Sequence, residues 1–127
     1  MFSAIKKVIV FAPHTDDGEF GCGATIARLI DENVEVHYVA FSACEQSVLP
    51  QFPKDILITE VKEATKILGI LDTNLHLLKF KVRTFSYHRQ EILDLMIKFR
   101  VSGSFIPQIL QPLIICLNDL KVFLCYF

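Results

Sequence analysis

The stretch 8–30, VIVFAPHTDDGEFGCGATIARLI, places one histidine and two adjacent aspartates between an apolar run and a glycine-rich segment. Its beginning belongs to segment 5–12, IKKVIVFA, which is nearly continuously apolar, as parallel strands buried on both faces tend to be. Segment 19–33 then predicts a helix, because apolar residues recur near helical spacing: Phe20, Ile26, Leu29 and Ile30. The stretch therefore predicts a strand, a charged turn and a helix in direct succession.

The same alternation continues along the chain. Further strands are predicted at 34–42, 74–80 and 103–107, and further helices at 55–69 and 86–100. The expected apolar faces of these two helices are Ile56, Val61, Ala64, Ile67 and Leu68, and then Ile92, Leu95, Met96 and Phe99. Alternating strands and helices are typical of right-handed βαβ units around a parallel sheet. We therefore expect an α/β fold, a Rossmann-like three-layer α/β/α arrangement with a mainly parallel sheet, incomplete at the C-terminus.

Length and composition limit the classes of function. The 127 residues fit a single domain, 1–127, and the formal net charge of −1 gives no case for nucleic acid or an anionic membrane. No apolar run approaches the roughly 18 residues of a membrane-spanning helix, and the N-terminal apolar stretch is too short for a signal peptide. The four cysteines form no CxxC pair. We expect free thiols, and with them a cytoplasmic location.

Two kinds of structure explain the spacing of the charged residues in the turn. His14 and Asp17 are three residues apart, so an imidazole nitrogen and a carboxylate oxygen can share a cation about 2.0–2.2 Å from each. Asp16, between them, is then placed to hold or deprotonate a water molecule. A solvated acidic turn that stabilises the N-terminus of the next helix explains the same residues. Both interpretations stay open on spacing alone.

The position of the turn favours a binding site. In parallel sheets, ligands bind beyond the carboxyl ends of the strands, which is where this turn is predicted to lie. The three nearby glycines, Gly18, Gly21 and Gly23, are a poor phosphate cradle, because they lack GxGxxG spacing directly after the strand. The acidic residues before them would also repel a phosphate. A nucleotide site is therefore the least favoured alternative.

The fuller stretch 8–30 resembles the opening signature of the PIG-L/LmbE-like family of zinc-dependent N-acetylglucosaminyl de-N-acetylases. That signature is a strand followed by A-(P)-H-P-D-D-E and a glycine-rich helix start. The resemblance continues through VEVHYVAFSACEQS, EVKEATKILGI and SYHRQEILDLMIKFR, and so covers about the first 100 residues. Thr15 stands where the commonest form has proline, and Gly18 separates the aspartates from Glu19. Neither departure removes a ligand.

The resemblance implies a role for each residue of the turn. His14 and Asp17 match the family's first two zinc ligands, and Asp16 matches the carboxylate that acts as general base. The implied reaction is hydrolysis of the N-acetyl group of an N-acetylglucosamine-type sugar or conjugate, which releases acetate and a free amine. The implied cofactor is Zn²⁺ or another divalent metal, and the implied partner is a small N-acetylated sugar. The substrate-binding residues are not identified, and a homo-oligomer stays open.

The sequence beyond residue 100 departs from the family. The family takes its third zinc ligand from an H-x-D-H-like segment just beyond the fourth strand. Here the residues after 103–107 contain no histidine, and of 13 basic and 14 acidic residues only Asp119 and Lys121 follow Arg100. We therefore expect 101–127 to be an atypical tail, produced by a frameshift or a truncated gene model. The nucleotide sequence of the last thirty codons decides between these explanations.

The remaining candidate side chains are expected to have ordinary structural roles. His37, His76 and His88 fall within elements or near their starts, away from the carboxyl ends of strands. Glu45, after the second strand, is expected to be a surface carboxylate, and Cys44 a small buried hydrophobic residue. None of these histidines is therefore expected to replace the missing ligand.

The sequence as a whole predicts a metal-dependent amide hydrolase that is impaired in this chain. With two ligands in place and a third absent, we expect weak zinc binding and little hydrolysis. The alternative is a non-catalytic remnant of the same fold that binds a sugar or a partner. The sequence leaves open the exact substrate, the native metal, and whether a neighbouring subunit donates the third ligand.

Overall fold

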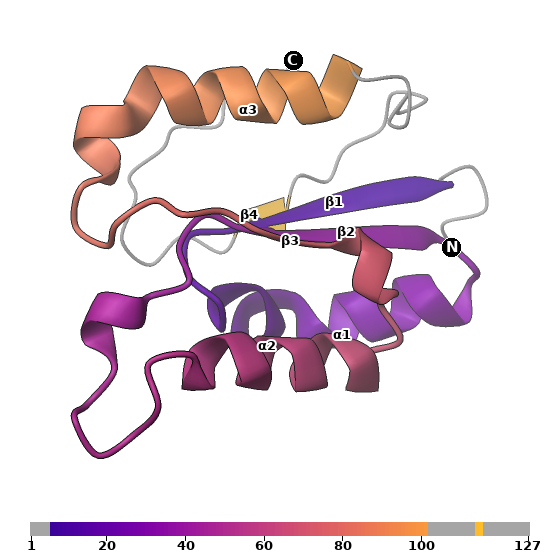
Figure 1. Cartoon of the computed structure of the whole chain (residues 1–127). Helices are drawn as coiled ribbons and strands as arrows, with labels where there is room; N and C mark the ends of the chain where they lie inside the picture. Colours follow the sequence, from indigo (N-terminus) through magenta and orange to yellow (C-terminus); the bar gives the residue numbers. More distant parts are fainter. Residues whose placement is uncertain (1–5, 102–113, 116–127) are drawn as a thin grey trace.

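The computed structural model describes residues 6–101 and 114–115 and arranges them as an α/β sandwich (Figure 1). The strands are β1 (Lys7–Ala12), β2 (Glu35–Ala40), β3 (Leu75–Leu77) and β4 (Ile114–Ile115). The helices are α1 (Asp17–Asp31), α2 (Ile56–Ile67) and α3 (Arg89–Val101), with short 3₁₀ turns η1 (Glu45–Ser47), η2 (Asp72–Asn74) and η3 (Phe85–His88). The strands lie in the order β3-β2-β1-β4, and every pairing between them is parallel. The expected α/β class and parallel sheet are confirmed.

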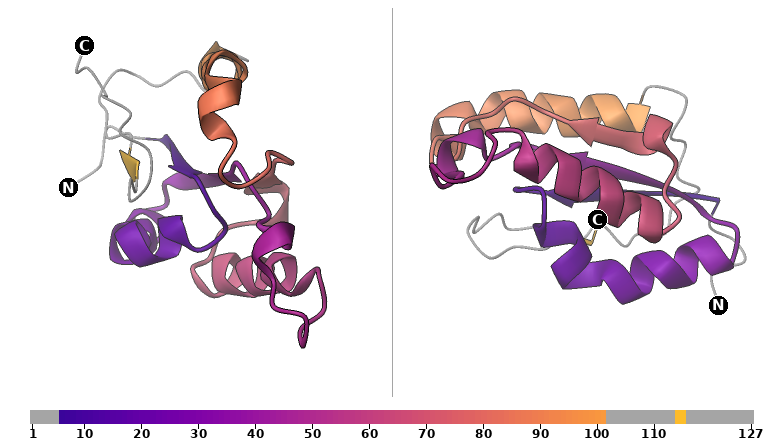
Figure 2. Two further views of the ribbon diagram at one scale, coloured as in Figure 1. Left: turned by 90° about the vertical axis from the view of Figure 1, so that its left-hand side faces the viewer. Right: turned by 60° about the horizontal axis from the view of Figure 1, so that its bottom comes forward.

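Helices cover both faces of the sheet. Figure 2 shows α1 and α2 on one face and α3 on the other. Because side chains alternate along a strand, β1 and β2 each contribute side chains to a core on both faces. The core under α1 and α2 is larger, and its strand residues are Val8, Val10, Ala12, Val36, Tyr38 and Ala40. The core under α3 contains Phe11, Val39, Phe41, Phe85 and Ile92. Burial on both sides explains why the strands are nearly continuously apolar.

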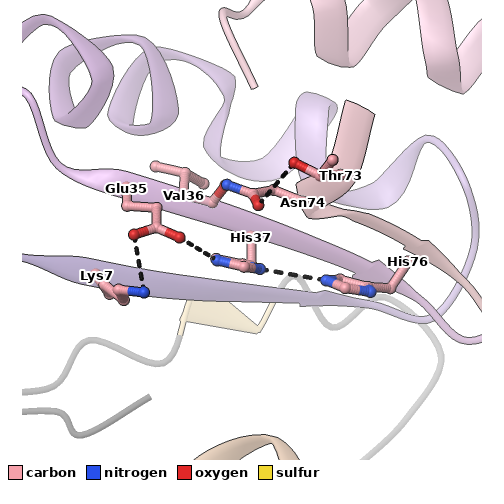
Figure 3. A network of polar contacts seen from close by, with 7 residues as sticks. All are labelled: Lys7, Glu35, Val36, His37, Thr73, Asn74 and His76. Carbon is pink, nitrogen blue, oxygen red and sulfur yellow. Dashed lines mark hydrogen bonds and ion pairs between the residues drawn. The ribbon is translucent and has the colours of Figure 1, made fainter. Parts of the chain in front are cut away.

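A chain of polar contacts crosses the α3 side of the sheet (Figure 3). Lys7 Nζ lies 2.9 Å from Glu35 Oε2, and the other oxygen of Glu35 lies 2.8 Å from Nε2 of His37. The Nδ1 atom of His37 lies 3.2 Å from Nε2 of His76, and the planes of the two imidazoles are nearly parallel. The ring of His76 also meets the edge of Phe99 on α3. The network therefore links β1, β2 and β3, and both histidines have structural partners, as expected.

Helical spacing alone puts two residues on the wrong side of their helices. Phe20 is 84% exposed and Ile67 is 86% exposed, although both were expected to face the core. The dihedrals of Cys22 are non-helical, so the first turn of α1 is out of phase with the rest. In α2 the side chain of Thr65 is buried instead of that of Ile67, and its hydroxyl donates a hydrogen bond to the carbonyl of Val61 at 2.7 Å. The stripe expected on α3 does pack against its core, through Ile92, Met96 and Phe99.

The ends of the elements also differ from the expected ranges by a few residues. Helix α1 begins at Asp17 rather than at 19, and the segment 86–88 belongs to the 3₁₀ turn η3 rather than to α3. The strand expected at 103–107 lies outside the described residues, and so does most of the tail 101–127. The structure does describe β4, which pairs with Val10 and Phe11 of β1.

Candidate metal centre

Strand β1 ends directly at the turn that carries His14, Asp16 and Asp17. The amides of Phe41 and Ser42 donate to the carbonyls of Ala12 and Pro13, which extends the pairing with β2 into the turn. Helix α1 then starts at Asp17. The chain places β2 and β3 on one side of β1 and β4 on the other. The turn after β1 therefore lies where the strand order reverses. Such a switch point is the usual place for a ligand in an open α/β sheet.

Within the turn, the side chains of His14 and Asp17 converge. One carboxylate oxygen of Asp17, Oδ2, accepts a hydrogen bond from the backbone N–H of His14 at 2.9 Å. The same oxygen lies 3.1 Å from Nδ1 of the imidazole. Behind the imidazole, the ring of Phe85 stacks at a centroid distance of 5.8 Å. The turn therefore holds one nitrogen and one oxygen donor together, against a buried aromatic wall from η3.

Asp16 has a different environment from its neighbour. It is exposed and occupies the N-cap position of α1, but its side chain makes no capping hydrogen bond. Glu19, one turn into the helix, has its pKa raised by burial and by the negative charges of Asp16 and Glu60. Asp16 is thus a solvent-accessible carboxylate beside the paired donors, in a locally negative field that favours a cation.

A hollow of about 260 Å³ opens beside the turn. Its walls come from the segments after β2 and β3, namely Ser42, Ala43, Cys44, Glu45, Gln46, Lys79, Phe80, Lys81 and Val82. Cys44 is buried as expected, and its pKa is raised by burial and by the charges of Asp16 and Asp17. Ser42, one of the residues that line the hollow, donates its amide to the carbonyl of Pro13, so the hollow adjoins the turn. Glu45 is exposed, as expected, and also lines the hollow.

The donor set fits one part of a zinc site. Imidazole nitrogen and carboxylate oxygen are ordinary zinc donors, and two such ligands on one tetrahedral zinc lie about 3.4 Å apart. The observed 3.1 Å between Nδ1 of His14 and Oδ2 of Asp17 is close to that separation. In residues 6–101 and 114–115, however, no three histidine, cysteine, aspartate or glutamate side chains group together as a metal site would require. The turn therefore brings together two donor atoms, one fewer than a catalytic zinc site takes from the protein.

The other three histidines, all of which the structure describes, do not provide a third metal ligand at the turn. His37 and His76 belong to the polar network on the sheet, and Nδ1 of His88 lies 3.1 Å from Oε2 of Glu91. Sequence reasoning did not find Phe85 or Tyr38, which both touch the turn. Alternation along β2 places Tyr38 on the same face as Val36 and was a usable signal. Phe85 comes from a 3₁₀ turn distant in sequence, and no local pattern indicates its contact with His14.

Comparison with known proteins adds a family model and two solved structures. The model of the PIG-L domain, GlcNAc-PI de-N-acetylase, matches residues 9–115. The chain is 28% identical to an N,N′-diacetylchitobiose deacetylase from Pyrococcus horikoshii, solved with its inhibitor MPG, at a TM-score of 0.65. It is 27% identical to the conserved protein TT1542 from Thermus thermophilus, at a TM-score of 0.60.

Both structural matches cover 76% of this chain, but only 38% and 43% of the respective matched chains. The chain thus spans less than half the length of the solved structures it matches. No curated protein matches it significantly. The family match reaches Ile115, somewhat beyond the first 100 residues covered by the recognisable motifs.

Proposed function

Since the chain belongs to the PIG-L family of GlcNAc-PI de-N-acetylases, we propose that it is built for zinc-dependent removal of the N-acetyl group from an N-acetylglucosamine-type sugar or conjugate. The observation that carries the proposal is the convergence of His14 Nδ1 and Asp17 Oδ2 at 3.1 Å, at the carboxyl end of β1. Similarity to a diacetylchitobiose deacetylase supports the same class of substrate. The family and this similarity together support a hydrolytic deacetylase.

In this proposal His14 and Asp17 hold the metal, and Asp16 is the general base. A bound zinc ion supplies Lewis-acid chemistry, in which it polarises the amide carbonyl and increases the acidity of water. Asp16 is suited to its role because its exposed carboxylate is not occupied by a capping hydrogen bond. It accepts the proton of the attacking water while the water oxygen bonds to the acetyl carbon. The carbon–nitrogen bond then breaks, and the leaving amine takes up the proton that Asp16 accepted.

The hollow beside the turn is the proposed place for the sugar. It adjoins the turn at Ser42, and its walls offer polar groups of several kinds, including the hydroxyl of Ser42, the carboxylate of Glu45 and the amide of Gln46. Sugar hydroxyls act as both donors and acceptors, so a mixed lining of this kind suits them.

The chain as written is expected to bind zinc weakly and to hydrolyse slowly. A catalytic zinc normally takes three protein ligands, whereas the described residues provide two at the turn. The residues after 107 contain no histidine. A third ligand from a longer form of the protein or from a second copy would complete the site.

Two measurements test the proposal together: zinc content by elemental analysis, and acetate release from N-acetylglucosamine and diacetylchitobiose. Asp17→Asn is expected to lower zinc affinity at least tenfold, because it replaces a charged ligand. Asp16→Asn is expected to keep the zinc content and to lower any acetate release at least a hundredfold. Glu45→Gln is a control for a carboxylate on the rim of the hollow, and it is expected to keep the zinc. Zinc binding that survives Asp17→Asn would rule out the proposed ligand pair.

A non-catalytic sugar-binding protein is the second candidate. The observation that favours it is the pair of ligands where three are needed. It predicts that N-acetylglucosamine binds to the chain and is recovered unchanged, with or without zinc. Acetate release that disappears in Asp16→Asn would exclude this candidate.

A further inference from the structure

The turn that contains His14, Asp16 and Asp17 is hydrogen-bonded to the side chain of Tyr38. Tyr38 lies in the middle of β2, is fully buried, and points into the core under α1 and α2. Its hydroxyl donates a hydrogen bond to the carbonyl of Thr15 at 2.9 Å. The same oxygen accepts a hydrogen bond from the amide of Gly18 at 3.0 Å. One side-chain oxygen therefore joins the two ends of the segment that contains Asp16 and Asp17.

The packing around the phenol is as specific as its hydrogen bonds. A Cβ atom placed on Gly18 would lie 2.5 Å from Cε2 of Tyr38 and 2.6 Å from its hydroxyl oxygen. Real Cβ atoms do not approach other atoms so closely, so position 18 must be glycine while Tyr38 is in place. Burial raises the pKa of Tyr38 far above its usual value, so its hydroxyl keeps the proton that it donates.

We propose that Tyr38 is a positioning residue for the metal-binding turn, which its hydroxyl holds in the conformation where His14 and Asp17 converge. Thr15 follows His14, and Gly18 follows Asp17. Fixing these two backbone groups fixes the separation of the ligands. The inference rests on the proposed function for the identity of the metal, but the hydrogen bonds exist without it. Partners that orient the ligands of a metal typically contribute ten- to hundredfold in affinity.

The test uses the full chain and the variant Tyr38→Phe, which keeps the ring in the core and removes both hydrogen bonds. Zinc affinity is measured by competition with a chromophoric chelator. Without metal, NMR measures the exchange rate of the Gly18 amide and the ring nitrogen shifts of His14. We expect zinc affinity to fall about ten- to hundredfold. We also expect faster exchange at Gly18 and a change at the His14 ring.

The matched control is Thr65→Val, which removes another buried hydroxyl that donates to a backbone carbonyl, in α2. It is expected to lower stability while leaving zinc affinity and the His14 signals unchanged. Unchanged zinc affinity in Tyr38→Phe, or an equal loss in Thr65→Val, would overturn the inference. If the unmodified chain binds no zinc, the proposed function fails. The metal-free NMR comparison then decides on Tyr38 alone, and an unchanged His14 signal rejects it.

Discussion

At the scale of single residues, the packing of α1 requires glycine at position 18 but not at position 23. Gly18 faces the ring of Tyr38 at a distance that leaves no room for a methyl group. Gly23, five positions later in the same helix, has no atom within 4 Å of the place where its Cβ would lie, apart from its chain neighbours and the nearby helix backbone. The two positions therefore form a natural pair for a single substitution.

We expect opposite effects from the same change at these two positions. Gly18→Ala should lower the free energy of unfolding by about 1–3 kcal/mol, because the ring or the turn must move. Gly23→Ala should raise it by about 0.5–1 kcal/mol, because alanine loses less backbone entropy in a helix. Urea unfolding followed by circular dichroism measures both values. A stable Gly18→Ala variant with unchanged Tyr38 contacts would contradict the packing described for the turn.

At the scale of secondary-structure elements, helical spacing did not settle which side chains are buried. In α2 the face toward the sheet contains Val61 and Thr65, while Ile67 points to solvent. A threonine can occupy a core position because its hydroxyl is satisfied by a carbonyl one turn earlier. Exposing Ile67 to solvent costs little free energy. Hydropathy alone therefore predicted the wrong one of Thr65 and Ile67 to be buried.

Two isoleucine substitutions test the assignment of the helix faces. Ile26→Ala, in α1, removes a fully buried side chain and should destabilise the protein by about 2–5 kcal/mol. Ile67→Ala, at the end of α2, removes a side chain that is 86% exposed and should change stability by less than about 0.5 kcal/mol. Thermal and urea unfolding report both. Equal losses in the two variants would mean that Ile67 is buried in solution.

The sequence predicted the order and class of the elements better than their contacts. The βαβ succession was clear because strands buried on both faces are almost continuously apolar. The spacing of His14 and Asp17 in one turn after β1 indicated that their side chains could meet, and they lie 3.1 Å apart; their role as metal ligands stays a prediction. The stacking of Phe85 on His14 and the hydrogen bonds of Tyr38 were not predicted, since both join segments that only the folded sheet brings together. The kink at Cys22, which lies between Gly21 and Gly23, was not predicted either.

At the scale of the whole molecule, the network of Lys7, Glu35, His37 and His76 joins three strands on the α3 side of the sheet. Burial lowers the pKa of His76, and the neighbouring His37 lowers it further. Hydrogen bonds from Lys7 and His37 lower the pKa of Glu35. The folded state therefore favours a neutral His76 and an ionised Glu35. In the described part of α3, the group facing this network is the uncharged ring of Phe99.

Acidification should weaken the fold through this network in two stages. The unfolded chain binds a proton at His76 near pH 6.5, before the folded chain does, so stability falls as the pH drops below about 6.5. The contribution of Glu35 is lost at lower pH, below its usual value of about 4.3. His76→Phe keeps an aromatic ring beside Phe99 and should reduce the loss between pH 7 and 5.5. Urea unfolding at several pH values measures the slope, and identical slopes would contradict this role for His76.

No helix in the part of the chain that the structure describes is long and apolar enough to cross a membrane. Within the described residues, Cys22 and Cys44 are buried and are not joined in a disulfide. The cytoplasmic location and the single-domain organisation stay predictions.

The contact between Tyr38 and the turn also has a consequence for the order of events during synthesis. The hydrogen bond from Gly18 to Tyr38 joins residues only 20 positions apart, within the first β-α-β unit. Closing so short a loop carries a small entropic cost. Chains emerge from the ribosome N-terminus first, so we expect the paired ligands to be in place before the C-terminal part has been translated. The later residues would then meet a preformed half-site.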